Sequence, residues 1–242
     1  MTKDVVWKDQ TLVKNYLTGV RGAIPMANEQ IDVMLRVICA LRPDGVTNFI
    51  DLGCGDGVLA DQILQAYPNA QGILIDFSAG MLSAAEDRMV QFADQLKLVE
   101  LDYGDPNWVE SLAGESFDLI ISGFSIHHQP DWRKKEIYQE IFDLLRPRGV
   151  FINSEHVKSA SPIVENIHDQ LFVDSMVAYE DTIGSGKTVD QIERDFYDRP
   201  DKEANILLDV QTQVRWLEEI GFQHADIYFK IFELSVFGGQ KP

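Results

Sequence analysis

Three glycines and two aspartates stand within seven residues, in the segment Asp51 to Gly57 with the sequence Asp-Leu-Gly-Cys-Gly-Asp-Gly. Glycine has no side chain, so the backbone at Gly53 and Gly55 can approach a bound ligand closely. The segment follows the apolar run 48–52 and precedes residues 58–67, whose apolar positions recur at helical spacing. A glycine-rich turn between a strand and a helix is typical of nucleoside-binding sites.

Two further carboxylates are expected at the same edge of the predicted sheet. Asp76 stands at the end of the next strand, residues 72–77, where it can accept hydrogen bonds from both ribose hydroxyls. Asp102 follows strand 98–101, with Tyr103 beside it, placed to accept from an adenine amino group or to stack on the base. Because these strand ends converge on one crevice, the sequence predicts a bound nucleoside.

Spacing and charge decide which nucleoside is expected. The dinucleotide fingerprint Gly-x-Gly-x-x-Gly is not met, because the third glycine, Gly57, comes one residue early. Asp51 and Asp56 would also repel a pyrophosphate in this loop, whereas they favour a cation. S-adenosyl-L-methionine has no phosphate and presents a sulfonium and an ammonium group, so it is the predicted cofactor. The glycine spacing disfavours a nicotinamide dehydrogenase.

The rest of the chain predicts the elements that position these residues. Strand-like and helical runs alternate as far as residue 154, which favours a parallel sheet covered by helices on both faces. The predicted strands are 48–52, 72–77, 98–101, 117–122 and 150–154, with 225–230 and 232–237 as a terminal antiparallel pair. Residues 157–207 break this rhythm with helical patches and many charges. We interpret them as a cap that covers a small acceptor.

These residues resemble the class I S-adenosylmethionine-dependent methyltransferases, with residues 49–57 as the first motif of that family. Residues 117–122 and 145–150 look like two later motifs, and the resemblance spans roughly residues 30–156. It implies an α/β fold with a Rossmann-like, doubly wound, seven-stranded sheet, mostly parallel with an antiparallel terminal strand, plus a helical cap insertion. The implied activity is methyl transfer from S-adenosyl-L-methionine to a small-molecule acceptor.

The same resemblance implies roles for individual residues around the cofactor. Asp76 would bind the ribose, Phe77 and Met81 would flank the adenine, and Asp102 and Tyr103 would reach its far edge. The full set of expected cofactor-binding residues is Asp51, Gly53, Cys54, Gly55, Asp76, Phe77, Met81, Asp102, Tyr103 and Ser122.

Similar enzymes fold an N-terminal segment over the cofactor. Residues 16–28 are the corresponding stretch here, and glycines and a proline interrupt any long helix within it. Arg21, in this stretch, has two open interpretations: it faces the methionine carboxylate of the cofactor, or it is an ordinary surface arginine.

Histidines and a glutamate follow the fourth and fifth predicted strands, at the edge where open α/β sheets bind ligands. His127 and His128 come after the fourth strand, and Glu155 and His156 end the fifth. The candidate catalytic residues are His127, His128 and Glu155, since a hydroxyl acceptor would benefit from a base, whereas a carboxylate or amine needs little or none. The competing interpretation is structural, as a helix cap or a contact to a loop carbonyl.

Two further patterns suggest functions that the sequence does not support. Residues 184–188, Gly-Ser-Gly-Lys-Thr, look like the end of a phosphate-binding loop, yet Asp181 occupies the position of its first glycine and no strand precedes it. No two histidines share a helix at the spacing of metal ligands, so no metal is predicted. His168 and His224 are expected to be solvated or structural.

The C-terminal third resembles the branch that contains carboxy-S-adenosylmethionine synthase. Residues 154–156 lead into the helical insertion, and residues 221–224 precede an aromatic strand pair. That enzyme holds the additional carboxylate of its product with an arginine of its cap, and Arg199 lies in the corresponding region. Two alternatives therefore stay open: an enzyme of this kind that modifies the cofactor itself, and a non-catalytic cofactor-binding protein.

Charge and composition narrow the class of protein and its partners. Lys and Arg number 21 against 39 Asp and Glu, which gives a net charge of -18 and disfavours nucleic acid as the substrate. Two cysteines without paired spacing fit a reducing compartment, and no apolar run is long enough for a membrane span. We expect a cytoplasmic protein that acts on a small-molecule acceptor; the oligomeric state stays open, a homodimer included.

The 242 residues suffice for one large domain with a single substantial core. Within it we expect an N-terminal helical cover (1–45), a cofactor-binding core (46–156), the helical cap (157–207), and a C-terminal helix with the strand pair (208–242).

Overall fold

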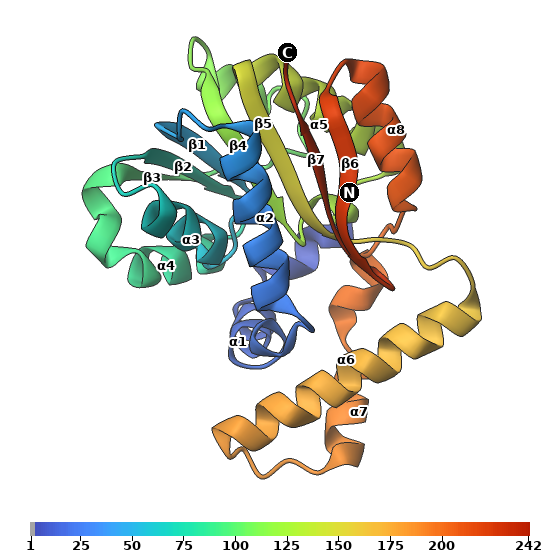
Figure 1. Cartoon of the computed structure of the whole chain (residues 1–242). Helices are drawn as coiled ribbons and strands as arrows, with labels where there is room; N and C mark the ends of the chain where they lie inside the picture. The colour runs from blue at the N-terminus through green and yellow to red at the C-terminus, as the bar shows by residue number, and fades with distance from the viewer. Residues whose placement is uncertain (1–2) are drawn as a thin grey trace.

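The computed structural model describes residues 3–242, so Met1 and Thr2, where the expected N-terminal cover begins, lie outside the described residues. At its centre is a seven-stranded sheet in the order β3-β2-β1-β4-β5-β7-β6 (Figure 1). The strands are β1 (Asn48–Leu52), β2 (Gln71–Asp76), β3 (Leu96–Glu100), β4 (Phe117–Gly123), β5 (Leu145–His156), β6 (Gln223–Ile231) and β7 (Leu234–Gln240). Strands β1 to β5 pair in parallel, whereas β7 is antiparallel to both β5 and β6. The predicted fold class is confirmed.

Helices cover both faces of this sheet. On one face pack α2 (Ala27–Leu41), α3 (Val58–Ala66) and α4 (Ala79–Arg88), and on the other α5 (Asp131–Leu144), α8 (Val210–Ile220) and the 3-10 helix η4 (Trp108–Leu112). Successive side chains of β1 alternate between the two cores: Phe49 packs with the first group and Ile50 with the second, and both are fully buried. A central strand that is buried on both faces has a continuous apolar sequence, which is why β1 and β4 were predicted within one residue of their bounds.

The remaining helices lie beyond the carboxyl ends of the parallel strands (Figure 1). They comprise η1 (Lys3–Lys8), α1 (Gln10–Thr18) and η2 (Val20–Ala23) from the N-terminal region, and α6 (Pro162–Ile183), α7 (Val189–Tyr197) and η6 (Pro200–Ala204) between β5 and α8. Two short 3-10 helices, η3 (Val90–Gln95) and η5 (Ile126–His128), complete the set. A small separate core joins α6 and α7 to the N-terminal region, with Phe172, Met176 and Phe196 against Ala23 and Ile24.

Three sequence predictions concern the start of β5, the loop 184–188 and membrane-spanning helices. Strand β5 begins at Leu145, five residues before the predicted start, because its pairing with β4 jumps from Phe117↔Leu145 to Leu119↔Val150 and the intervening residues bulge out. Residues 184–188 connect α6 to α7, and Lys187 bonds to Glu180 and Asp195, so the loop serves as a helix connection. Within residues 3–242, no helix combines the length and apolar composition that crossing a membrane requires.

Candidate active site

The loop between β1 and α3 has the backbone conformation that its glycines suggest. Gly53, Gly55 and Gly57 have φ angles of +70°, +53° and +76°, in the left-handed region that other residues avoid. A side chain at Gly53 would also overlap the hydroxyl of Ser125, which follows β4. The sequence Gly-x-Gly-x-Gly is therefore a structural requirement of this turn.

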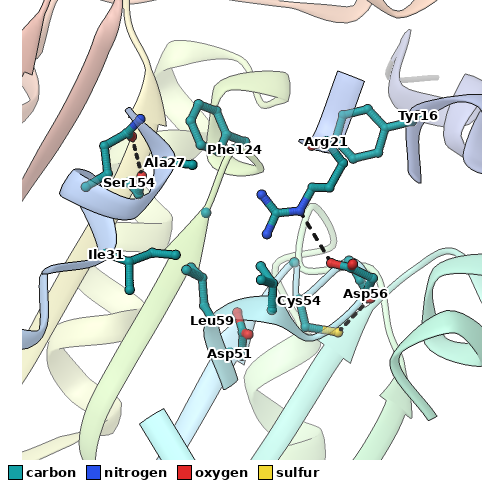
Figure 2. Close-up of a pocket in the computed structure, with 15 residues that line it drawn as sticks. Tyr16, Arg21, Ala27, Ile31, Asp51, Cys54, Asp56, Leu59, Phe124 and Ser154 are labelled. Atoms are coloured by element: carbon teal, nitrogen blue, oxygen red, sulfur yellow. Dashed lines mark hydrogen bonds and ion pairs between the residues drawn. The ribbon is translucent and has the colours of Figure 1, made fainter. Parts of the chain in front are cut away.

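A cavity of about 50 Å³ lies beside this loop, and we call it the glycine-loop pocket (Figure 2). Its walls come from the N-terminal region, α2, the β1–α3 loop, and the ends of β4 and β5. The lining residues are Tyr16, Arg21, Ala27, Gln30, Ile31, Asp51, Gly53, Cys54, Gly55, Asp56, Val58, Leu59, Gly123, Phe124 and Ser154. Four of the expected cofactor-binding residues are thus together in one pocket: Asp51, Gly53, Cys54 and Gly55.

Asp51 carries the most unusual carboxylate of the pocket. It is 1% exposed; its Oδ2 accepts from the backbone N–H of Ala60 at 3.1 Å, while its Oδ1 has no hydrogen-bond partner among residues 3–242. Desolvation by burial, with the nearby charges of Asp76 and Asp56, raises the pKa of Asp51 to about 7. A cationic ligand group beside the free oxygen would relieve this cost.

Arg21 lines the glycine-loop pocket on the side opposite Asp51 (Figure 2). Its side chain extends from η2 toward the loop, and its Nε lies 3.5 Å from Oδ1 of Asp56 (Figure 2). With 18% of its side chain exposed, Arg21 is no ordinary surface arginine. The pocket therefore offers a carboxylate to a cation and a guanidinium to an anion.

Asp76 joins strand β2 to the same loop. Its Oδ2 accepts from the backbone N–H of Gly55 at 2.9 Å and its Oδ1 from that of Ser78 at 2.8 Å. Burial raises the pKa of Asp76 to about 6, although these hydrogen bonds act in the opposite direction. Its carboxylate is held in place at the strand end, as the sequence predicted for a ribose-binding residue.

The other expected cofactor residues lie outside the glycine-loop pocket. The N-terminal segment covers their region: the hydroxyl of Ser78 donates to the carbonyl of Trp7 at 2.7 Å, and Lys8 lies over the Phe77 ring, 5.8 Å from its centre. Met81, on α4, is 6% exposed. Ligand contact by Phe77 or Met81 would therefore require this segment to shift.

Asp102, Tyr103 and Ser122 have local partners. Asp102 is exposed and accepts from the N–H of Gly104, whereas Tyr103 is 4% exposed and shares a hydrogen bond of 2.6 Å with the Ser125 hydroxyl. Ser122 is fully buried within β4, and its hydroxyl donates to the carbonyl of Leu52 at 2.7 Å. The structure thus positions Ser122 inside the sheet, so that its hydroxyl links β4 to β1 and faces no pocket.

A second cavity of about 80 Å³ adjoins the first, and we call it the histidine pocket. Tyr16 and Phe124 line both cavities. The lining residues are Trp7, Tyr16, Val20, Ile24, Phe124, His127, His128, His156, His168, Asp169, Phe172, Phe196, Arg199, Asp201, Lys202, Asn205 and Leu234. The sheet edge, the N-terminal region and the α6–η6 segment all contribute to it.

Two of the candidate catalytic residues form a hydrogen-bonded pair: His127 lines this pocket, and the fully buried Glu155 lies behind it. Nδ1 of His127 lies 2.5 Å from Oε1 of Glu155, and the other carboxylate oxygen accepts from the backbone N–H of His127 at 3.1 Å. Burial lowers the pKa of His127 well below its usual value, and the charges of His156 and Lys134 add to this. Burial raises the pKa of Glu155. A neutral imidazole that donates from Nδ1 to Glu155 leaves Nε2 as a hydrogen-bond acceptor.

His128, the third candidate, is held between two other elements. Its Nε2 accepts from the indole N–H of Trp7 at 3.2 Å, and its Nδ1 lies 3.3 Å from the carbonyl oxygen of Ala204. Its ring also packs against that of His127, with centroids 4.0 Å apart. The ring of His127, in contrast, is held by the buried carboxylate of Glu155.

Three further residues of the histidine pocket are Phe124, His168 and Arg199, of which sequence reasoning missed Phe124. Phe124 has a φ angle of +51°, which is uncommon for a residue other than glycine and marks a strained turn after β4. His168 was expected to be solvated or structural, but it is 2% exposed and lines the pocket. Arg199 also lines it, with its guanidinium over the rings of Phe196 and Phe172, and Lys202 lies beside it.

Comparison with protein-family models identifies the family. A model described as a methyltransferase domain matches residues 43–208, from the segment before β1 to the end of the cap. The chain belongs to this methyltransferase family. It is a class I S-adenosylmethionine-dependent methyltransferase by family, and S-adenosyl-L-methionine is its cofactor.

Individual relatives match this chain over different lengths. Trans-aconitate 2-methyltransferase of Deinococcus radiodurans is 35% identical over 101 residues, which cover 42% of this chain but only 34% of that protein. Carboxy-S-adenosyl-L-methionine synthase of Nautilia profundicola is 19% identical over 232 residues, or 95% of this chain and 92% of that one. Human N-acetylserotonin methyltransferase, solved with S-adenosylmethionine, shares the fold with a TM-score of 0.51 at 14% identity, over 94% of this chain and 51% of that one.

The chemistry of the glycine-loop pocket suits this cofactor. S-adenosyl-L-methionine has a cationic ammonium and an anionic carboxylate on its amino-acid portion. The unpartnered oxygen of Asp51 suits the first, and the guanidinium of Arg21 suits the second. Two carboxylates in the loop, Asp51 and Asp56, also make it a poor site for a pyrophosphate.

Proposed function

We propose that this methyltransferase transfers a methyl group to a small-molecule acceptor bound in the histidine pocket. The observation that carries the proposal is the adjacency of two pockets with different chemistry, which share Tyr16 and Phe124 as walls. One suits the amino-acid portion of the cofactor. The other is lined by His127, which is paired with the buried carboxylate of Glu155, and its walls include residues of α6, α7 and η6.

The residues of the glycine-loop pocket would hold the cofactor. Asp51 would bind its ammonium and Arg21 its carboxylate, while Asp76 would accept hydrogen bonds from the ribose hydroxyls. The bound cofactor supplies a methyl group on a positively charged sulfur, which is already electrophilic. The contribution of the chain is therefore mainly to align the acceptor with that methyl group and to exclude water.

His127 would take the proton of a hydroxyl acceptor at Nε2. Its Nδ1 is oriented by Glu155, and the imidazole is neutral because burial lowers its pKa. Glu155 would fix the tautomer and the ring orientation, in the way a carboxylate orients a general base. His128 would position the pair through its contacts to Trp7 and to the His127 ring.

A small acceptor fits this arrangement better than a macromolecule. The histidine pocket lies beneath the cap and N-terminal helices, and the net charge of -18 opposes a polyphosphate chain. We also propose a cytoplasmic protein organised as one domain with the four parts defined from the sequence. Cys39 and Cys54, both free thiols, are compatible with that location.

One observation favours a second function. The match to carboxy-S-adenosyl-L-methionine synthase extends over nearly the whole of both chains, and Arg199 lies in the histidine pocket. An enzyme of that kind would modify the cofactor rather than an external acceptor. A non-catalytic cofactor-binding protein is the third alternative, since binding alone requires only the glycine-loop pocket.

Native mass spectrometry of freshly purified protein, followed by a turnover assay, separates these functions. A methyltransferase retains S-adenosylmethionine or S-adenosylhomocysteine and forms the latter when its acceptor is supplied. Retention of a carboxylated cofactor would instead favour the synthase-like function. Binding without turnover to S-adenosylhomocysteine, across a panel of hydroxyl, thiol, amine and carboxylate acceptors, would favour the non-catalytic alternative.

A further inference from the structure

Three metal-ligating side chains converge at one end of the histidine pocket. His156 is the last residue of β5, Glu233 lies in the turn between β6 and β7, and His168 is in α6. Nε2 of His156 is 2.7 Å from Oε2 of Glu233, and Nε2 of His168 is 3.7 Å from the same oxygen. One ligand atom from each residue lies within 4.8 Å of the others.

The fold holds these residues together. His156 pairs with Leu234 across β5 and β7, and the backbone N–H of Val157 donates to the carbonyl of Glu233 at 2.8 Å. His168 comes from α6, and its ring centroid lies 5.6 Å from that of His156. Three separate elements therefore fix the three side chains, as in binding sites whose geometry is set before the ligand arrives.

The contacts of His168 with its neighbours do not explain why this polar side chain is buried. It is 2% exposed, its Nδ1 has no hydrogen-bond partner among residues 3–242, and its Nε2 reaches Glu233 only at 3.7 Å. Buried polar groups are nearly always hydrogen-bonded, because an unpaired one costs about 1–3 kcal/mol. An ion pair between His156 and Glu233 accounts for those two residues but leaves His168 without a role.

We propose that His156, His168 and Glu233 bind one divalent transition-metal ion, with Zn²⁺ as the best fit. Two imidazoles and one carboxylate are a ligand set of zinc sites that keep an open position. In a tetrahedral site with bonds of about 2.0–2.1 Å, two ligand atoms lie about 3.3 Å apart. The distances of 2.7 and 3.7 Å to Oε2 of Glu233 fall on either side of this value.

Charges around the cluster both favour and oppose a cation. The charges of Lys202 and Lys230 both interact with His168, and they would repel a metal ion. Asp169 acts in the opposite sense: it lines the same pocket, and its charge interacts with Glu233, His156 and Lys202. The negative charges of Glu233 and Asp169 therefore offset the positive charges of the two lysines. Metal binding would then depend on the three ligand atoms themselves.

The position of this ion also bears on which acceptor can bind, an inference that rests on the proposed function. His156 and His168 both line the histidine pocket, and the ring centroid of His156 is 5.6 Å from that of His127. An acceptor whose oxygen or sulfur coordinates the ion would lie beside the proposed base. The structure thereby narrows the acceptor to a molecule with such a donor atom.

Metal binding is tested without cofactor or acceptor, so its outcome is independent of methyl transfer. The full chain, with any affinity tag removed, is treated with a chelator, dialysed, and titrated with Zn²⁺ in a calorimeter. We expect saturation at one ion per chain and, with Co²⁺ in its place, visible absorption bands of a tetrahedral ion. His168→Leu and Glu233→Gln should each weaken Zn²⁺ binding by more than about 100-fold, because each removes a direct ligand and even outer partners contribute 10- to 100-fold.

His224→Asn is the matched control, because His224 is exposed and asparagine tolerates its φ angle of +55°. This variant should bind Zn²⁺ as the wild type does. His168→Leu should also keep the wild-type melting temperature without metal, since it replaces an unpartnered buried ring by an apolar side chain. Absence of saturable Zn²⁺ binding in the wild type, or unchanged binding in both ligand variants when they are folded, would overturn the proposal.

Discussion

The glycine-loop pocket takes six of its lining residues from positions 51–56 and 58, whereas the histidine pocket collects its residues from segments scattered between Trp7 and Leu234. The first pocket is therefore built by one turn and its flanking strand and helix. The second exists only once the sheet, the N-terminal region and the cap have packed together. Under the proposed function, cofactor recognition would be local in sequence, while acceptor recognition would depend on tertiary structure.

The two pockets also differ in their charges. In the glycine-loop pocket, buried carboxylates with raised pKa values, Asp51 and the adjacent Asp76, face a single arginine, Arg21. In the histidine pocket, four imidazoles lie between two acidic and two basic side chains. A site for a fixed, zwitterionic cofactor needs charges at defined positions, whereas a site for proton transfer needs a neutral group that can accept a proton.

The largest expected effect is that of His127→Gln on the rate of methyl transfer. If the acceptor is a hydroxyl, we expect the rate to fall by about 10²- to 10⁴-fold, because the variant lacks a base at Nε2. The dissociation constant for the cofactor should stay within about twofold, since His127 does not line the glycine-loop pocket. Formation of S-adenosylhomocysteine under single-turnover conditions measures the rate. His224→Asn is the control, and full activity of His127→Gln would exclude His127 as the base.

Sequence reasoning succeeded where local pattern determines structure. Strand β1 was predicted at its observed bounds and β4 within one residue, because buried central strands are apolar throughout. Gly53 and Gly55 were expected in a turn that approaches a ligand, and their positive φ angles agree with that. Helix ends are harder to predict, because they depend on weak local preferences: α4 ends at Arg88, and a 3-10 helix begins two residues later.

The histidine pocket shows where such reasoning fails. His168 comes 12 residues after His156 and 65 residues before Glu233, so no short spacing pattern joins the three residues. The family resemblance implies a cofactor role for Ser122, whereas its hydroxyl donates to the carbonyl of Leu52 within the sheet, so that role stays a prediction. Which residues meet across a pocket depends on packing between elements, and a search for motifs on one helix cannot detect that.

A second prediction tests the ribose role of Asp76. Asp76→Asn keeps the shape of the side chain and one carbonyl oxygen, but it removes the negative charge and one acceptor. A hydrogen bond to a charged group contributes about 1.5–3 kcal/mol, so the cofactor's dissociation constant should rise by about 10- to 100-fold. Calorimetric titration with S-adenosylhomocysteine measures it. An unchanged dissociation constant would contradict the placement of the ribose at β2.

A third prediction concerns Asp51 and has a defined pH dependence. Its folded-state pKa is about 7, above the ordinary value of 3.8, so between these values the folded protein binds more protons than the unfolded chain. The free energy of unfolding of the cofactor-free protein should therefore fall as pH rises from about 4 to about 7. Asp76 and Asp56 face Asp51 and add to this effect, whereas Arg21 and the N–H of Ala60 oppose it.

Asp51→Asn removes this contribution. The variant should be more stable than the wild type at pH 8, by on the order of 1 kcal/mol, and the difference should shrink toward pH 5. It should also bind S-adenosylmethionine more weakly, because the ammonium loses its carboxylate partner. Thermal melts and calorimetry from pH 5 to pH 8 measure both quantities. A variant that is less stable at pH 8 and binds the cofactor normally would show that the Asp51 carboxylate serves the fold alone.

The smallest expected effect is a change in the hydrogen-exchange rates of backbone amides. It tests whether the cap and the N-terminal region are held in place by ligands in the two pockets. Residues 181–191 are all exposed, and α6 and α7 contact the rest of the chain mainly through the small core with Ala23 and Ile24. Few buried apolar contacts imply low local stability, so amide hydrogens of α7 should exchange faster than those of β1 and β4 in the cofactor-free protein. Tyr16 and Arg21 line the glycine-loop pocket, so S-adenosylhomocysteine bound there should slow exchange in residues 10–23 more than in α7. Cofactor and acceptor together should also slow exchange in α7, because this helix forms part of the wall of the histidine pocket.

Hydrogen exchange read by mass spectrometry measures the cofactor-free protein, the cofactor complex and the complex with cofactor and acceptor. Uniformly slow exchange of the cap without ligand would show that it is a fixed wall, and that the acceptor enters by another route.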